Sequence, residues 1–207
     1  MFKEISYTEA VNFLLPKHYS GRKPVVQKAF GAFSDGKLKA VCTFGKPASD
    51  SVCRGICGVE FKDKVFELNR LCRTDDYCEP LSKFVGWCLK ELKPLKWIVV
   101  SYSDTAMNHH GYIYQACNFI YTGATKKRTD PYNGNTKHSR HIKCDTKLRQ
   151  VRSSKHRYVY FCGDKRTVKL YKKNFNWEVF SYPKGDNSNY SLGFVLKPQI
   201  VEGGGLQ

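Results

Sequence analysis

The sequence contains no long hydrophobic run and no leader-like beginning. Its longest apolar stretches, such as Trp97 to Val100, are far shorter than the ~20 residues that a helix needs to cross a bilayer. The first residues, MFKEISYTEAVNF, lack the charged and then apolar order of a secretory signal peptide. We therefore expect a protein that is neither secreted nor attached to a membrane.

Acidic residues are scarce. Asp and Glu number 18 against 35 Lys and Arg in 207 residues, a formal net charge of +17. The imbalance is concentrated in residues 126–207, which carry 18 basic and 6 acidic residues. Because basic side chains that neutralise phosphates release condensed counterions, this excess favours a polyanionic partner. The hydrophobic content of 41% excludes a disordered basic tail, and the length favours one core with an appendage.

Several binding motifs are also missing. The chain has neither a Walker loop nor a G-x-G-x-x-G after a strand, which argues against dinucleotide and nucleoside-triphosphate enzymes. Its nine cysteines are an odd number, so we expect reduced thiols rather than a disulfide framework. The Cys53-x3-Cys57 and Cys72-x5-Cys78 spacings do not match a structural zinc site.

The hydrophobic patterns that are present predict an α+β fold around a mixed sheet. Ser6 and Glu9 form a capping-box pattern at the start of a helix over 6–15. Asp35-Gly36 favours a tight turn between two strands. The predicted helices cover 6–15, 81–92 and 109–117, the predicted strands cover 28–34, 37–45, 65–72, 96–104, 119–123 and 156–162, and 46–63 is predicted to be a crossing loop.

Polar side chains gather where the predicted strand 96–104 ends. Ser101, Ser103 and Asp104 stand there, and ligands bind beyond the carboxyl ends of strands in open sheets. Asp104 is a candidate catalytic group, although an Asp in this place also caps helices. His18 and Tyr19 follow the first helix in a loop, where His can act as a base.

Arg70 interrupts an otherwise apolar strand. A buried Arg needs a partner, which is either an internal carboxylate such as Asp104 or a phosphate-bearing ligand. His18 and Asp104 are also ligand types that suit iron or manganese, and their spacing does not decide whether they bind a metal.

Five segments together resemble the Mom family of bacteriophage DNA-modification proteins. They are HYSGR (18–22), LNRL (68–71), SYSDTAMNHHGYIYQACNFIYTG (101–123), KHRYVYF (155–161) and YPKG (182–185). The third is the most specific, since it joins an Asp after a strand to a G-x-I-Y-Q-A helix and a strand that ends in Y-x-G. The likeness spans about residues 10–185.

The resemblance implies a fold like that of the GNAT acyltransferases and an enzyme that converts adenine to N6-carbamoylmethyladenine in duplex DNA. This modification would protect a phage genome from host restriction endonucleases, in the cytoplasm of the infected bacterium. The implied catalytic residues are His18, Tyr19, Asp104 and Tyr114, and Arg70 is also implied to have a functional role. With Ser101 and Ser103, which stand at the end of the strand, we place Arg70 in the donor site. A homodimer is compatible with this interpretation.

The donor is left open between acetyl-coenzyme A and an aminoacyl compound, with iron as a candidate metal at His18 and Asp104. GNAT enzymes cradle pyrophosphate in a Gly-rich loop, whereas the corresponding segment here, CRTDDYCEPLSK (72–83), has no glycine. A carbamoylmethyl group is attached through carbon, so simple acetyl transfer would not produce it.

We expect a GNAT-like catalytic core over 1–125, a basic extension over 126–200 that completes the sheet and binds DNA, and a flexible tail over 201–207. The expected DNA contacts are Lys126, Lys127, Arg128, Arg140, Lys155 and Arg157. Two alternatives stay open: an acetyltransferase of the same fold that acts on RNA or protein amines, and a basic DNA-binding protein without catalysis.

Overall fold

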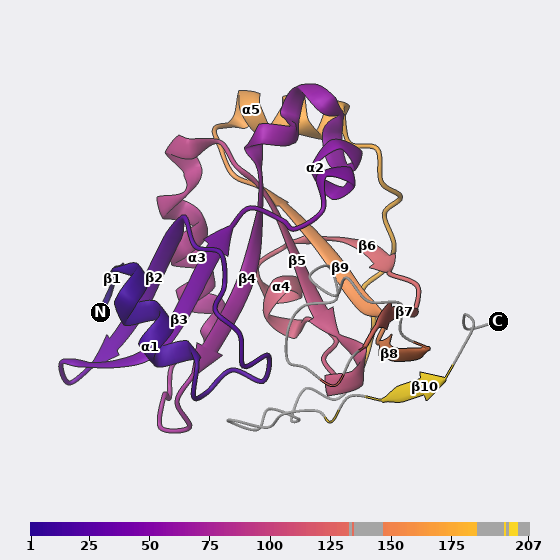
Figure 1. The fold of residues 1–207 in the computed structure, drawn as a ribbon. Coiled ribbons are helices and arrows are strands. Elements are labelled where there is room, and N and C mark those ends of the chain that lie inside the picture. Colours follow the sequence, from indigo (N-terminus) through magenta and orange to yellow (C-terminus); the bar gives the residue numbers. More distant parts are fainter. Residues whose placement is uncertain (133, 135–146, 186–196, 198, 203–207) are drawn as a thin grey trace.

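A seven-stranded mixed sheet forms the centre of the molecule (Figure 1). The computed structural model describes residues 1–132, 134, 147–185, 197 and 199–202. The strands lie in the order β1-β2-β3-β4-β5-β9-β6, and β4 and β5 are parallel while the other neighbours are antiparallel. The strands of this sheet are β1 (Phe2–Glu4), β2 (Lys28–Ser34), β3 (Lys37–Gly45), β4 (Val65–Arg73), β5 (Ile98–Asp104), β6 (Ile120–Ala124) and β9 (Lys155–Phe161).

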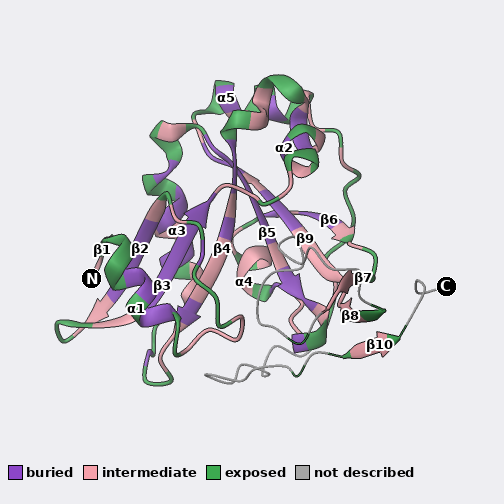
Figure 2. Cartoon of the chain, in the orientation of Figure 1, coloured by how far each residue is buried: buried purple, intermediate pink, exposed green. Residues whose placement is uncertain are grey.

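Helices cover both faces of this sheet. On one face, α3 (Leu81–Glu91) contributes Phe84, Val85, Cys88 and Leu89 to the largest apolar cluster. On the other face, α1 (Tyr7–Leu14) packs on the β2–β3 half, and α2 (Asp50–Cys57) and α5 (Lys165–Lys173) pack on β4, β5 and β9. The strands between these layers are the most buried part of the chain (Figure 2).

Shorter elements connect these layers. α4 (Tyr112–Ala116) precedes β6, and three 3-10 turns cover Val59–Lys64, Lys93–Leu95 and Thr105–Met107. A separate three-stranded sheet has the order β10-β8-β7 and contains β7 (Arg128–Pro131), β8 (Leu148–Arg152) and β10 (Ile200–Glu202). Within the described ranges, no helix has the length and apolar character needed to span a membrane.

Local sequence signals account for the N-terminal elements. Ser6 caps α1, its hydroxyl accepts the Glu9 backbone N–H, and the Glu9 carboxylate accepts the Ser6 backbone N–H, so the capping box is confirmed. Asp35 and Gly36 both have positive φ, +50° and +72°, as the predicted tight hairpin turn requires.

The predicted crossing loop over 46–63 is wrong. This segment contains α2 and a 3-10 turn, and Cys53, Ile56 and Cys57 bury one side of α2 against the sheet. The predicted helix over 109–117 is shortened to α4, because Asn108 and Gly111 have positive φ before it begins. Seven described cysteines are free thiols, as expected: Cys42, Cys53, Cys57, Cys78, Cys88, Cys117 and Cys162.

The chain after residue 125 contributes a central strand. β9 lies between β5 and β6, and its pairing with β5 runs from Ile98 opposite Phe161 to Asp104 opposite Lys155. From the expected tail over 201–207, Val201 and Glu202 lie in β10, and 203–207 lie outside the described residues.

Candidate active site

The two parallel strands separate halfway along their length. β4 and β5 pair only from Val65 opposite Ile98 to Leu68 opposite Ser101. Beyond this point β4 pairs with β3 alone and β5 with β9 alone. The buried Ser101 hydroxyl donates to the Leu68 carbonyl at 3.0 Å, at the last pair before the separation. Ser101 therefore holds the two strands together where they part, rather than facing a ligand.

A cavity of about 260 Å³ opens at this separation. It is bounded by the loop after α1, by the separated parts of β4 and β5, by the segment that leads into α4, and by the start of β9. The polar side chains that line it are Lys17, His18, Tyr19, Glu67, Asn69, Arg70, Tyr102, Ser103, His109, His110, Tyr112, Tyr114 and Lys155. Five of the residues predicted for the catalytic and donor sites are thus brought together from four separate parts of the chain: His18, Tyr19, Arg70, Ser103 and Tyr114.

His18 and Tyr19 enter the cavity from the loop that follows α1. Their rings stack with centroids 4.4 Å apart, and the Tyr19 ring makes an edge contact with His109. The Ser20 backbone N–H donates to His18 Nδ1 at 3.1 Å, and the Ser20 hydroxyl lies 2.9 Å from the same nitrogen. Because Nδ1 accepts a backbone hydrogen bond, the proton of the neutral ring is on Nε2.

The environment keeps the His18 ring neutral. Burial, together with the positive charges of Arg70, His109 and Lys155, lowers the pKa of His18 from 6.5 to about 3. A neutral ring with its proton on Nε2 presents a hydrogen-bond donor through that atom. His18 is therefore suited to polarise a carbonyl oxygen and poorly suited to accept a proton.

The tyrosines of the cavity are held in their neutral form. Burial, with the nearby carboxylate of Asp104, raises the pKa of Tyr19 to about 12. Burial, with Glu67 nearby, raises the pKa of Tyr102 to about 12. Burial raises the pKa of Tyr114 well above its usual value. Each hydroxyl is a donor at neutral pH, and each ring offers an apolar surface against which a planar group can stack.

Arg70 keeps much of its hydrogen-bonding capacity free for a ligand. Its Nη1 donates to its neighbour's carbonyl, Asn69 O, at 2.7 Å, and Nη2 lies 3.5 Å from Arg22 O. Its buried Nε has no partner among the described residues. Among the described residues no internal carboxylate, Asp104 included, makes an ion pair with Arg70, although the charge of Glu67 is close enough to interact with it. An anionic ligand is the alternative that remains.

Glu67 is a carboxylate of the cavity that sequence reasoning missed. It is the only carboxylate among the described lining residues, and no described residue forms an ion pair with it. Burial raises the pKa of Glu67 above its usual 4.5, and the charges of Arg70 and Lys155 oppose that rise. A carboxylate whose pKa is raised toward neutrality by burial is suited to accept a proton at pH 7.

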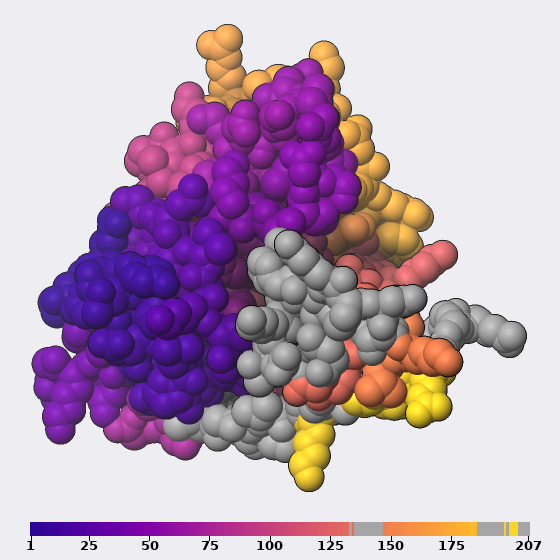
Figure 3. Space-filling view, in the orientation of Figure 1, coloured from indigo at the N-terminus to yellow at the C-terminus, as the bar shows by residue number. Residues whose placement is uncertain are grey.

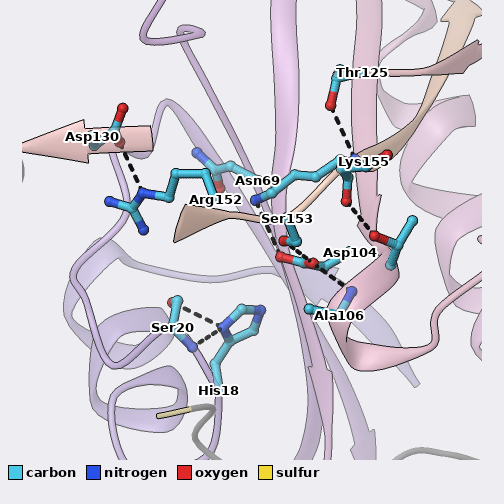
Figure 4. A network of polar contacts seen from close by, with 12 residues as sticks. His18, Ser20, Asn69, Asp104, Ala106, Thr125, Asp130, Arg152, Ser153 and Lys155 are labelled. Atoms are coloured by element: carbon cyan, nitrogen blue, oxygen red, sulfur yellow. Dashed lines mark hydrogen bonds and ion pairs between the residues drawn. The ribbon is translucent and has the colours of Figure 1, made fainter. Parts of the chain in front are cut away.

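Asp104 lies behind the cavity wall rather than on it. Its Oδ1 accepts the Ala106 backbone N–H at 3.0 Å and the Ser153 hydroxyl at 2.5 Å, and its Oδ2 lies 3.6 Å from Lys155 Nζ (Figure 4). Asp104 therefore caps the 3-10 turn Thr105–Met107, the capping role that the sequence analysis gave as the alternative to catalysis. It also positions Lys155 at the cavity. The nearby Ser103 hydroxyl does line the cavity, is buried, and has no partner among the described residues.

The described residues do not support an iron site. Within the described ranges, no group of three or more His, Cys, Asp or Glu side chains gathers as a metal site would require. His18 Nδ1 is bonded to Ser20, and both Asp104 oxygens have protein partners. The His18 and Asp104 pair therefore does not fit a metal.

The described residues expected to contact DNA divide into three groups. Lys126, Lys127 and Arg128 are exposed before and at the start of β7. Lys155 lines the cavity. Arg157 is engaged internally, since its Nε donates to the Thr122 hydroxyl at 2.8 Å and its guanidinium lies 3.6 Å from the centre of the Trp177 ring. Arg140 lies outside the described residues.

The segment between β4 and α3 is unlike a pyrophosphate cradle. It carries Asp75, Asp76 and Glu79 and no glycine. α3 begins after Pro80, whose side chain makes no capping hydrogen bond. Asp76 pairs with Lys39, and Glu79 pairs with Lys83. Fixed negative charge at this helix start disfavours a bound diphosphate.

Comparisons with known proteins agree with this architecture. A model of the Mom protein family matches residues 1–184. The N-acetyltransferase from Staphylococcus aureus Mu50 has a TM-score of 0.51 at 12% identity, over 78% of this chain and 98% of that chain. The ribosomal-protein-S18-alanine N-acetyltransferase from Escherichia coli has a TM-score of 0.47 at 9% identity, over 79% of this chain and 94% of that chain. No functionally curated protein matches the chain. The family match and the Staphylococcus aureus structure show that the fold is GNAT-like, as the resemblance implied.

Proposed function

Because the chain belongs to the Mom protein family, we propose that this GNAT-fold transferase converts adenine to N6-carbamoylmethyladenine in duplex DNA. The observation that carries the proposal is the match of the family model over residues 1–184, which includes every described residue that lines the cavity. The product would protect phage DNA from restriction endonucleases in the cytoplasm of the infected host.

The residues that line the cavity support this substrate. Enzymes that act on a base of a duplex take that base out of the stack and hold it between aromatic or apolar side chains. Tyr19, Tyr102 and Tyr114 line the cavity and supply such surfaces. The exposed Lys126, Lys127 and Arg128 would bind the phosphates of the flanking duplex.

The proposed chemistry assigns one role to each polar group. Adenine N6 is weakly basic because its lone pair is delocalised into the ring, so a base must remove a proton as the new bond forms. The N6–H bond breaks as the N6–C bond forms, Glu67 accepts the proton, and the donor's leaving group departs with the electron pair. His18 Nε2–H and the Tyr19 hydroxyl donate to the developing oxyanion, and Arg70 binds an anionic part of the donor.

The donor is constrained by the atoms of the product. A carbamoylmethyl group contains a nitrogen that an acetyl group lacks, so acetyl-coenzyme A alone does not supply it. An aminoacyl donor of the glycyl type carries the same atoms, and its transfer gives N6-glycyladenine, an isomer of the product. In the rearrangement that completes the product, the bonds from N6 to the carbonyl carbon and from the CH2 carbon to the amine break, and bonds from N6 to the CH2 carbon and from the amine to the carbonyl carbon form. We therefore favour an aminoacyl donor over acetyl-coenzyme A. The segment before α3 supports this choice, because it has acidic residues in place of the glycines that cradle the pyrophosphate of coenzyme A.

The test is mass spectrometry of nucleosides digested from plasmid DNA of bacteria that express the chain. We expect a deoxyadenosine adduct that coelutes with synthetic N6-carbamoylmethyl-deoxyadenosine and is absent from a soluble Glu67→Gln/Arg70→Gln variant. Cells fed with nitrogen-labelled glycine should transfer the label to the adduct. An unmodified deoxyadenosine pool would overturn the proposal, and acetylated RNA or protein amines in its place would identify the alternative acetyltransferase.

A further inference from the structure

α5 carries a one-sided row of positive charge. Thr167 and Tyr171 are buried on its inner side, where the Tyr171 hydroxyl donates to the Lys96 carbonyl at 2.6 Å. Its five basic residues occupy about 120° of the helix surface at 3.6 residues per turn, and all are exposed. They are Lys165, Arg166, Lys169, Lys172 and Lys173, and we call them the α5 stripe.

Folding alone does not require this arrangement. The pairs 165/169, 166/169, 169/172 and 169/173 place like charges three or four residues apart, which destabilises a helix by about 0.2–0.5 kcal/mol per pair. Lys165 and Arg166 also stand in the first turn, where the helix dipole disfavours cations, and no acidic residue follows the Asp164 cap there. No described carboxylate forms an ion pair with the stripe. A local conflict of this kind points to a function.

The stripe lies at the opposite end of the sheet from the cavity. The start of α5 lies next to the start of β5. Lys96 and Trp97 directly precede β5, Lys96 Nζ lies 3.8 Å from Asp164, and the Cys162 N–H donates to Trp97 O. The cavity is lined by Tyr102 and Ser103, near the other end of β5. At about 3.3 Å per strand residue, the two ends are roughly 20 Å apart. In Figure 1, α5 is at the upper edge and the arrowheads of β4 and β5 point away from it.

We propose that the α5 stripe is a second phosphate-binding surface that holds a separate segment of duplex DNA, so that one molecule bridges two segments. From Lys165 to Lys173 the helix spans about 12 Å, the axial length of three to four nucleotides of one strand at ~3.4 Å each. The orange atoms of this region project from the upper edge of the molecule (Figure 3), open to a large partner. The proposal goes beyond adenine modification, and its choice of duplex DNA as the partner rests on the proposed function.

The chemistry of the surface selects a polyanion. Apart from Leu170, the exposed residues of α5 from Lys165 to Lys173 are all basic, so an apolar protein partner would find little to bury. A row of Lys with one Arg provides point charges without a planar recognition element, which suits backbone phosphates rather than base edges. Duplex DNA is the polyanion that the proposed function already brings to the protein.

The test is a bridging assay with the full chain. A bead-bound duplex captures a second, fluorescent duplex only when one protein assembly holds both. We expect Lys165→Gln/Lys169→Gln/Lys172→Gln to reduce capture by roughly tenfold or more, whereas binding to a single duplex weakens by about twofold because one of two surfaces is kept. Adenine modification by this variant, read by nucleoside mass spectrometry, should be unchanged.

The matched control removes the same charge elsewhere. Lys3→Gln/Lys37→Gln/Lys83→Gln changes three exposed residues on β1, β3 and α3 and should bridge as the wild type does. Equal bridging by the stripe variant and the wild type would overturn the proposal, as would an equal loss in the control, which would indicate net charge alone. Loss of RNA or anionic-vesicle binding with DNA bridging intact would overturn the assignment of the partner. Because bridging needs no modification, its failure and that of the proposed function are distinguishable.

Discussion

The two halves of the β4–β5 pair differ in what their residues do. In the paired half, Val65, Ile98 and Val99 are fully buried and belong to the apolar clusters. In the separated half, Arg70 and Tyr102 face a cavity, and their backbones pair only with the outer neighbours β3 and β9.

The comparison shows that the site forms where the pairing of β4 with β5 stops. Side chains of β4 and β5 that would otherwise pack against each other are far enough apart there to admit a ligand. The backbone groups of β4 and β5 still form hydrogen bonds with β3 and β9. Glu67 stands at the border, opposite Val100 in the last two pairs. Substitutions in the two halves should therefore affect different measurements.

The largest expected effect is on catalysis. Glu67→Gln removes the proposed proton acceptor and keeps the size of the side chain, so we expect the modification rate to fall by about 10²–10⁴-fold with unchanged thermal stability. Because burial raises the pKa of Glu67 above 4.5, the wild-type rate should rise with pH through a midpoint above 4.5, and the variant should lack this limb. Glu60→Gln, on an exposed turn, is the control. A near wild-type rate in Glu67→Gln would assign the proton to another group.

A substitution in the paired half should affect folding instead. Ile98→Ala leaves a cavity beneath α2 and α5, and we expect the free energy of unfolding to fall by about 2–5 kcal/mol. Urea unfolding measures this loss. Activity per folded molecule should stay close to that of the wild type, and a large loss of specific activity would mean that the two halves are not separable.

His18 should make stability depend on pH. Its folded pKa is depressed from 6.5 to about 3, so below pH 6.5 the unfolded chain binds a proton that the folded chain does not. The neutral ring contributes fully to the free energy of unfolding above pH 6.5, and this contribution is lost as pH falls toward 3, by about 1.4 kcal/mol per pH unit. Between pH 7 and pH 5, the free energy of unfolding should therefore fall by about 2 kcal/mol more for the wild type than for His18→Gln. Parallel pH curves for the two proteins would show that His18 is exposed to solvent.

Two serines on β5 give the smallest and sharpest contrast. Ser101→Ala removes the hydrogen bond to Leu68 O at the point of separation and should cost about 1 kcal/mol. Ser103→Ala removes a buried hydroxyl without a described partner, so the free energy of unfolding should stay unchanged or rise slightly. Ser103→Ala should instead weaken substrate binding, seen as a raised KM, and the reverse assignment of the two effects would contradict the described geometry.

The sequence predicted the elements whose signals are local. The capping box of α1, the Asp35-Gly36 turn and the apolar run of β5 each depend on neighbouring residues. α2 was missed because Gly55 and its polar neighbours weaken the helical pattern, although Ile56 and the cysteines beside it are buried. The family resemblance correctly identified the fold. Of the residues to which it assigned roles, His18, Tyr19, Arg70 and Tyr114 line the cavity, and their roles stay predictions.

The roles of two carboxylates could not be read from the sequence. Glu67 alternates with Phe66 and Leu68, the pattern of a strand residue that faces solvent, and only the separation of β4 from β5 turns that side into a cavity. Asp104 stands at the end of a strand, as site residues often do. Its carboxylate oxygens, however, contact Ser153 and Lys155, which lie about 50 residues further along the chain. Both outcomes depend on contacts between distant segments.

The position of β9 sets an order for the maturation of the protein. During synthesis, the segment through β6 emerges before the strand that must separate β6 from β5. Until residue 161 has left the ribosome, β5 has an open edge at which the backbone groups of Ile98, Val99 and Val100 lack their β9 partners, the kind of edge that invites aggregation. The same strand delivers Lys155 to the cavity, so nascent chains acquire their last cavity wall in the step that closes this edge.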